Sequence, residues 1–274
     1  MLSVNTNTGA MVALQYLNKT EADLQTTQSH INSGLKVAGP KDNGAVYAIA
    51  QNMRGNVAGY AAVSDSLNRG VSTVDVAISA GQSISDLLNE LKGKALAAAD
   101  ASLDTASRNA LNADFTALRD QITTIVQNAS FNGTNLVDGT TANIQALASA
   151  DGSKKITAAA QTLKLSGSIV TVKSTSTIST TGKASTMVST INSSIQNVNA
   201  SLAKLASSSK KFSIQSSFVS KLVDTLNAGI GNLVDADMAV ESAKLQSLQV
   251  RQQLGVQALS IANSAPSITL SLFR

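Results

Sequence analysis

Apolar residues recur at alternating steps of three and four between residues 188 and 233. Twelve of the fourteen positions in this register are apolar, while Ser, Asn, Gln, Lys and Thr dominate the positions between them. The register consists of Val188, Ile191, Ile195, Val198, Leu202, Leu205, Ser209, Phe212, Ser216, Val219, Val223, Leu226, Ile230 and Leu233. Such a repeat predicts one helix with a narrow apolar stripe. The helix would be about 70 Å long and would have to bury its stripe against other long helices.

The same repeat predicts helices elsewhere in the chain. It is sustained from residue 46 to 88, with an extension to about Ala99, and it reappears at 111–125 and at 238–262. Residues 1–35 carry a weaker version, in which two positions are polar: Leu14, Leu17, Glu21, Leu24, Gln28, Ile31 and Leu35. A helix with so broken a stripe is marginal by itself and needs a partner.

Glycine and proline punctuate these helices. Gly34 and Pro40 interrupt the helical pattern after the first helix, and Asp42 or Asn43 could cap the second helix. Pro266 is the only other proline, so long helices are free to form between the two. We expect Pro266 to stop the last helix.

The pattern changes in the middle of the chain. Asn132-Gly133 and Asp151-Gly152 are turn signals, and residues 163–166 and 169–172 alternate between apolar and polar. We interpret residues 140–186 as a small insert of short β-hairpins, with a loop at 174–183. The predicted fold is therefore mainly α: a long, coiled-coil-like helical hairpin or bundle with a β-hairpin-rich insert in the middle of the chain.

Composition narrows the possible functions. Aromatic residues make up only 3% of the chain, the formal net charge is +4, and Cys is absent. Nucleic acid is not an expected partner, because paired basic residues are few and stacking aromatics are scarce. The chain has no disulfide framework or thiolate metal site, and no apolar run approaches the length of a membrane span. No cleavable signal pattern precedes the first helix, which leaves open an export route that uses an uncleaved N-terminus.

Candidate chemistry is sparse. His30 is the only histidine, and its polar surroundings favour a solvated side chain over a catalytic one. Asp235, Asp237 and Glu241 form the densest carboxylate group; a cation site is conceivable, but helix capping is the simpler interpretation. We therefore expect no catalytic residue, no cofactor and no metal site.

Local sequences at both ends of the chain resemble those of bacterial flagellin. Near the N-terminus these are Val4-Asn5-Thr6-Asn7, Ser33-Gly34-Leu35-Lys36, Lys41-Asp42-Asn43 and Phe131-Asn132-Gly133. Near the C-terminus they are Asp235-Ala236-Asp237, Gln252-Gln253-Leu254-Gly255, Ala262-Asn263 and Leu270-Ser271-Leu272-Phe273-Arg274. The resemblance covers about residues 1–140 and 185–274.

The resemblance implies a subunit that is exported unfolded through the flagellar type III secretion apparatus and then polymerises into the extracellular filament used for swimming. Its implied partners are copies of itself or paralogous flagellins, together with a hook-junction protein, a filament cap and an export chaperone. It also implies a division into segments. These are an inner coiled coil (1–43 and 236–274) and an outer bundle formed by N-terminal helices (44–139), the β-rich insert (140–186) and the long helix (187–235).

By this analogy, apolar residues of the inner coiled coil carry self-assembly. The candidate residues are Leu14, Leu17, Leu24, Ile31, Leu245, Leu248, Leu259, Leu270, Leu272 and Phe273. Two alternatives remain open: a hook–filament junction protein or related axial protein, and a secreted enzyme or lectin that uses the β insert.

One departure from the family pattern concerns an innate receptor. Residues 88–94 correspond to the flagellin segment read by a vertebrate Toll-like receptor, and Glu90 stands where the family usually has Arg. Because the charge is inverted, we expect weak or absent receptor activation. Receptor activation can be measured with reporter cells exposed to the purified monomer. Strong activation would contradict the expectation.

Overall fold

The computed structural model describes the backbone of residues 6–271 and the side chains of residues 6–264. The described helices are α1 (Thr8–Ser33), α2 (Gly44–Ala98), α3 (Thr105–Asn128), α4 (Thr181–Val234) and α5 (Met238–Ser271). Four short strands, β1 (Ser130–Phe131), β2 (Thr134–Asn135), β3 (Asn143–Leu147) and β4 (Lys155–Ala159), form two antiparallel hairpins. The predicted fold class, mainly α with β-hairpins in the middle of the chain, is confirmed.

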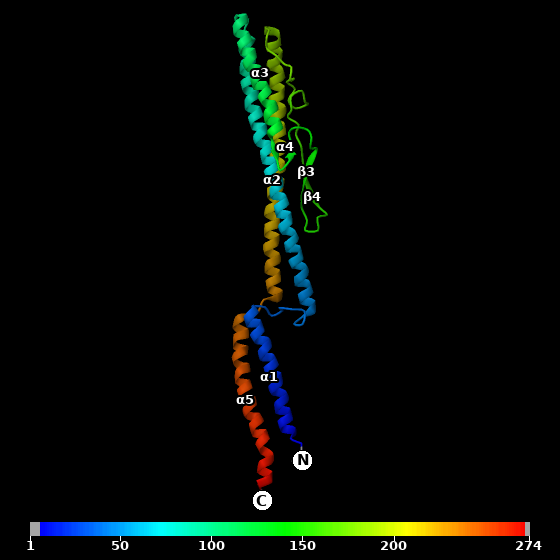
Figure 1. Cartoon of the computed structure of the whole chain (residues 1–274), viewed down its shortest axis with the longest axis vertical. Coiled ribbons are helices and arrows are strands. Elements are labelled where there is room, and N and C mark those ends of the chain that lie inside the picture. Colours follow the sequence, from blue (N-terminus) through cyan, green and yellow to red (C-terminus); the bar gives the residue numbers. More distant parts are fainter. Residues whose placement is uncertain (1–5, 272–274) are drawn as a thin grey trace. The chain divides into compact units, whose positions relative to one another are not determined.

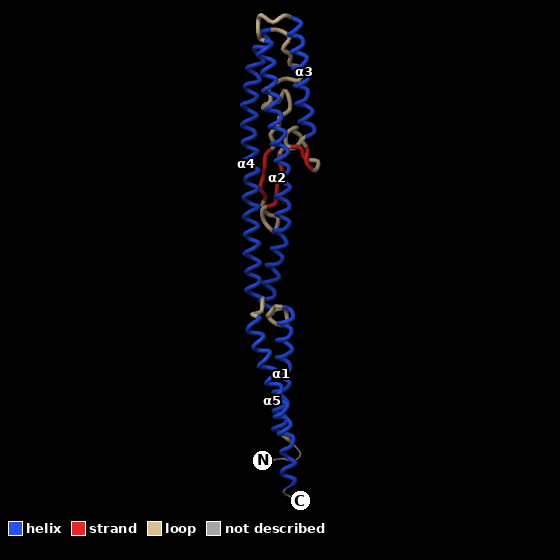
Figure 2. Tube along the Cα trace, turned by 90° about the vertical axis from the view of Figure 1, so that its left-hand side faces the viewer, coloured by secondary structure: helices blue, strands red, loops and turns tan. Residues whose placement is uncertain are grey.

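The chain divides into two compact units. One contains residues 1–55 and 225–274, and the other contains residues 56–224. In the first unit α1 and α5 lie side by side (Figure 1). In the second unit α2, α3 and α4 lie alongside one another, with the strands against them (Figure 2). The finer division into inner and outer segments drawn from the family resemblance stays a prediction.

The apolar stripe of α4 is buried as its spacing predicts. All fourteen positions of the 188–233 register are buried or half-buried. Phe212, Leu205 and Ile191 are fully buried. They share one core with residues of α2 and α3 such as Leu88 and Phe115. The physical reason is the one read from the sequence, since a 3–4 repeat keeps one face of each helix turned toward its neighbours.

Three glycines of α2 lie where neighbours approach most closely. A Cβ atom added to Gly59 would lie 2.8 Å from the carbonyl oxygen of Ala150, and one at Gly81 would lie 2.7 Å from a methyl carbon of Leu202. At Gly70 it would meet the ring of Phe212 at 3.2 Å. Each glycine costs helix stability, by up to about 1 kcal/mol relative to Ala. Close packing is what the chain gains at these positions.

Side chains at the helix ends explain where the helices begin. Asn43, not Asp42, caps α2, because its Oδ1 accepts a hydrogen bond from the Val46 amide at 3.0 Å. Asp42 instead accepts from the amides of Ala38 and Gly39 and so holds the preceding turn. Asp237 caps α5 by accepting from the amides of Ala239 and Val240, which supports the capping interpretation of this carboxylate.

The β insert differs from the prediction in its second half. The Asp151-Gly152 turn joins β3 to β4 as predicted, with Gly152 at φ 72°. Residues 163–166 and 169–172 form no strands, although Leu163, Leu165, Val170 and Val172 are buried. Their alternation arises because these residues bury alternate side chains in the core of the second unit without a regular ladder partner. In addition α4 begins at Thr181, so the 174–183 loop is shorter than predicted.

Pro266 does not stop α5, contrary to the prediction. The helix continues through it to Ser271. A proline inside a helix leaves one carbonyl without its intrahelical donor, and the cost of passing through such a position falls when another group donates to that carbonyl. The carbonyl concerned is that of Ala262, and it accepts a hydrogen bond from the side chain of Asn7.

Asp151 stabilises the β3–β4 turn in a pH-dependent manner. Hydrogen bonds from the Ser149 hydroxyl, and then from the Ser153 amide and hydroxyl, lower the pKa of Asp151 from its ordinary 3.8 to about 2. The stabilisation is therefore complete above pH 3.8 and is lost as the pH falls through about 2. An NMR titration of the Asp151 carboxyl carbon should give a midpoint near 2. A midpoint at the ordinary value would contradict the arrangement. Asp151→Asn lacks the titrating carboxyl, so its turn should not show this contribution to the pH dependence of stability.

Candidate assembly interface

The antiparallel pair of α1 and α5 contains most of the candidate residues. Leu17 and Leu248 are buried in it, at 9% and 5% exposure. The side chain of Leu17 also covers Gly255, where an added Cβ would lie 3.3 Å from Leu17 Cδ1. Leu24, Ile31, Leu245 and Leu259 are half-buried. The structure therefore brings six of the candidate residues to one interface.

The remaining candidates are placed differently. Leu14 is 47% exposed and lies outside the seam between α1 and α5. Leu270 belongs to α5, but its side chain is beyond the described ones. Leu272 and Phe273 lie outside the described residues. The role of the whole set in self-assembly stays a prediction.

The seam of α1 follows a different register from the predicted one. Leu17, Leu24 and Ile31 belong to both, but the structure combines them with Ala10, Ala13, Thr20 and Thr27. The predicted positions Leu14, Glu21 and Gln28 are exposed. Small residues fill every second position of the true seam, so its apolar signal is weak in the sequence. On α5 the predicted register 238–262 is buried or half-buried, except for Met238 at its start.

Polar groups interrupt the α1–α5 seam. His30 is not solvated as predicted, because α5 covers it: His30 Nδ1 lies 3.2 Å from Glu241 Oε1, and each side chain is 13% exposed. Lys244 approaches the other carboxylate oxygen at 3.8 Å. Thr27 Oγ1 is buried without a hydrogen-bond partner among the described residues. Such groups reduce the stability that the seam supplies.

A second apolar stripe on α5 faces away from α1. It contains Val250, Leu254 and Ile261, which are 55%, 57% and 71% exposed. At 100° per residue this stripe lies opposite the seam that contains Leu248 and Leu259. The helix is therefore apolar on two faces, of which only one has a partner in the chain. The 4–7 spacing of these three residues was available in the sequence but was not used in its interpretation.

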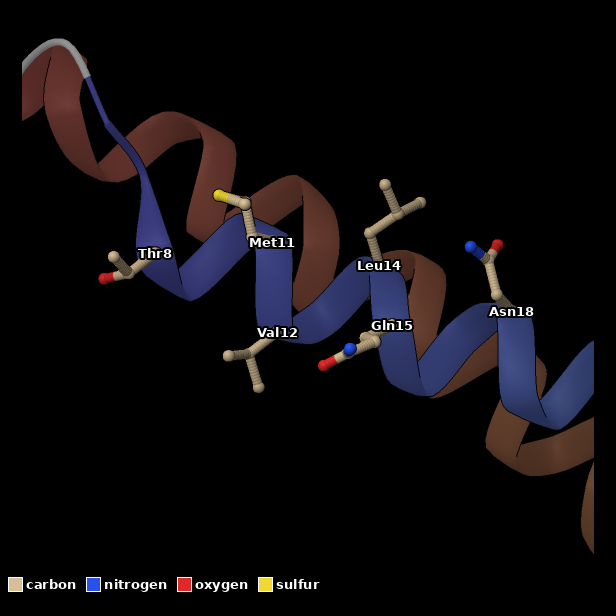
Figure 3. Close-up of a pocket in the computed structure, with 6 residues that line it drawn as sticks. All are labelled: Thr8, Met11, Val12, Leu14, Gln15 and Asn18. Atoms are coloured by element: carbon tan, nitrogen blue, oxygen red, sulfur yellow. The ribbon is translucent and has the colours of Figure 1, made fainter.

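The N-terminal turns of α1 are also apolar and uncovered. Met11, Val12 and Tyr16 are 64%, 50% and 69% exposed. Met11 and Leu14 project on one side of the helix and Val12 on the other, around a shallow hollow that Gln15 and Asn18 also line (Figure 3). Among the described residues, ten of the fourteen exposed large apolar side chains lie on α1 or α5. That concentration marks an interaction surface.

Other kinds of site are not evident in the described residues. Within residues 6–271, His, Asp and Glu side chains form no cluster of three that could hold a metal ion. In the same part of the chain, none of the helices combines the length and the apolarity that crossing a lipid bilayer requires.

The chain matches known families over most of its length. A family model described as the N-terminal helical region of bacterial flagellin matches residues 4–142, and one for the C-terminal helical region matches residues 188–273. The chain is 54% identical to flagellin FljM of Caulobacter vibrioides over 272 residues, which cover 99% of this chain and 98% of FljM. It is 35% identical to a flagellin of Brucella melitensis, with all of both chains covered.

A solved structure gives a weaker likeness. The crystal structure of Bacillus cereus flagellin has a TM-score of 0.43 and 19% sequence identity to this chain, with 65% of this chain and 92% of that one covered. This likeness is too slight to support an inference.

Proposed function

The chain belongs to the bacterial flagellin family, and from that premise we propose that α1 and α5 are the surfaces through which it polymerises into the flagellar filament. The protein is a structural subunit of that filament. The observation that carries the proposal is the outward apolar stripe of α5 at Val250, Leu254 and Ile261. Copies of the same chain, or paralogous flagellins, would cover it.

The energetics favour such an arrangement. Burying a fully exposed Val, Leu or Ile side chain contributes about 1.5–3 kcal/mol. Burial of the half-exposed apolar residues on α5 and on the first turns of α1 would together contribute several times the free energy gained from one side chain. A contact of this kind is heterologous when different faces of the two copies meet, and it generates an open helical polymer when the rotation between copies does not close a ring.

We further propose that the chain is exported unfolded through the flagellar secretion apparatus and orders its ends only during polymerisation. The polar groups in the α1–α5 seam support this, because they leave the isolated pair with little stability to spare. Neighbouring copies would then offset the entropy cost of ordering these helices. The extracellular filament would transmit torque for swimming, with a hook-junction protein, a filament cap and an export chaperone as further partners.

Circular dichroism tests the proposed disorder-to-order transition. We expect the dispersed monomer to show fewer helical residues than the polymer, with a difference of up to the length of α1 plus α5, which contain 26 and 34 residues. Equal helicity in the two states would contradict the transition.

Electron microscopy tests the filament proposal itself. The purified chain, transferred out of denaturant, should form long filaments without any other protein. A chain that forms only short or capped oligomers, and that extends only when another flagellin is added, would indicate a hook–filament junction protein instead.

A further inference from the structure

Inside α5, one backbone carbonyl lacks its usual amide donor, and this missing donor is the vacancy that Pro266 creates. In a regular helix the carbonyl of Ala262 accepts a hydrogen bond from the amide of residue 266. Residue 266 is proline, which has no N–H, and the helix nevertheless continues to Ser271. An unpaired backbone carbonyl is costly to the extent that it is shielded from water, and this site is partly buried, so a donor from elsewhere stabilises the helix.

The side chain of Asn7 supplies that donor. Asn7 Nδ2 donates to the carbonyl oxygen of Ala262 at 2.6 Å, across 255 residues of sequence. The Oδ1 atom of the same side chain accepts from the amide of Ala10 at 3.0 Å and so caps α1. The oxygen of this one amide group therefore accepts a hydrogen bond in the first turn of α1, and its nitrogen donates one to the interrupted turn of α5. Aspartate, an equally good helix cap, could only accept.

The apolar seam does not by itself fix how α1 lies along α5. Its positions repeat every seven residues, so a slip by seven residues keeps apolar faces together. The polar contacts do not repeat. His30 meets Glu241 near one end of the pair, and Asn7 meets Ala262 near the other. Pro266 is the only proline of α5. The carbonyl of Ala262 is therefore the only carbonyl in the interior of that helix for which the residue four positions later has no N–H.

We propose that Asn7 is a positioning residue that fixes the register of α1 on α5 by filling the vacancy left by Pro266. In the native register both the donor of Asn7 and the carbonyl of Ala262 are satisfied. In a register slipped by seven residues the donor of Asn7 faces a carbonyl that already has an intrahelical partner, while Ala262 keeps none. The proposal concerns the pairing of α1 with α5 within one chain, which by the proposed function becomes ordered when the chain polymerises.

The absence of cysteine in this chain allows the register to be measured directly. Leu17 Cβ lies 3.9 Å from the position of a Cβ at Gly255, within the range that a disulfide spans. The pair Leu17→Cys and Gly255→Cys reports the native register. The pair Leu17→Cys and Leu248→Cys reports a slip by seven residues. In a buffer of reduced and oxidised glutathione, one cysteine thiolate attacks oxidised glutathione, forms a mixed disulfide and releases one reduced glutathione. The second cysteine thiolate then attacks the mixed disulfide, closes the bridge and releases a second reduced glutathione, so the equilibrium constant for closure measures each register.

Each reporter pair is placed in four full-length chains: the native sequence, Asn7→Asp, Pro266→Ala, and both together. Asn7→Asp keeps the cap on Ala10 but removes the donor to Ala262. We expect it to lower the closure constant of the native pair about tenfold, which corresponds to one lost hydrogen bond. The closure constant of the slipped pair should rise relative to that of the native pair.

Pro266→Ala is the rescuing change, because it restores the amide that Ala262 lacks. In that background Asn7→Asp should change closure of the native pair by less than about twofold. Two results would overturn the proposal: an unchanged closure constant for Asn7→Asp in the native background, or the same loss with and without Pro266. The bridge is intramolecular, so closure measured on polymerised protein reports the register, while sedimentation of the same samples reports polymerisation separately. Failure of either proposal can therefore be distinguished from failure of the other.

Discussion

Replacing Phe212 with alanine is expected to lower the free energy of unfolding of the helical bundle by about 3–5 kcal/mol. Phe212 is fully buried in the core of the 56–224 unit, and its ring lies over Gly70 on α2. Truncation removes the apolar area and leaves a cavity, because glycine offers no side chain that could move into the space. Denaturant unfolding of the monomer, followed by circular dichroism at 222 nm, measures the change.

Phe218 provides the matched control for this prediction. It lies on the same helix, six residues further along, but is 56% exposed. Phe218→Ala should change the free energy of unfolding by no more than about 1 kcal/mol. Equal effects of the two substitutions would mean that the stripe of α4 is not the buried face.

Placing a carboxylate at Leu248 is expected to abolish polymerisation. Leu248 is 5% exposed in the α1–α5 seam. An ionised aspartate there would lose its hydration without gaining a partner, at a cost of at least about 3 kcal/mol. Polar groups already interrupt this seam, which reduces the stability available to offset that cost. Sedimentation and electron microscopy after removal of denaturant measure the loss of polymer.

The control for this second prediction adds the same charge one residue away. Gln249 is exposed on the side of α5, so Gln249→Asp should leave polymerisation within about twofold of the native chain. Thermal unfolding of the 56–224 unit should be the same in both variants, which would show that Leu248→Asp acts on the helix pair alone. Normal filaments from Leu248→Asp would exclude the proposed role of the seam.

The sequence was most informative where large apolar residues occupy nearly every seam position. The stripe of α4 satisfies this condition, and each of its fourteen positions is buried or half-buried as predicted. In α1 the true seam combines Leu17 and Leu24 with Ala13 and Thr20, which carry little apolar signal. The larger Leu14 therefore drew the prediction to the wrong neighbouring positions.

Local rules failed where a distant residue changes the outcome. Pro266 is a helix breaker by any short-range rule, but Asn7 supplies the bond that it removes. His30 was expected to be solvated because its own helix is polar, whereas Glu241 of α5 covers it. Alternation at 163–166 indicated a strand, although burial against the neighbouring helices produces the same pattern. In each case the deciding partner lies far away in the sequence.

The close-packed glycines of α2 restrict how the length of this helix can change during evolution. Gly59, Gly70 and Gly81 follow one another at intervals of eleven residues, and each faces a different neighbour: Ala150, Phe212 and Leu202. Deleting or inserting seven residues between them would preserve the phase of the apolar stripe but would set side chains where only a hydrogen atom fits. Insertions and deletions should therefore be purged from this stretch and accumulate in the loops around the hairpins instead.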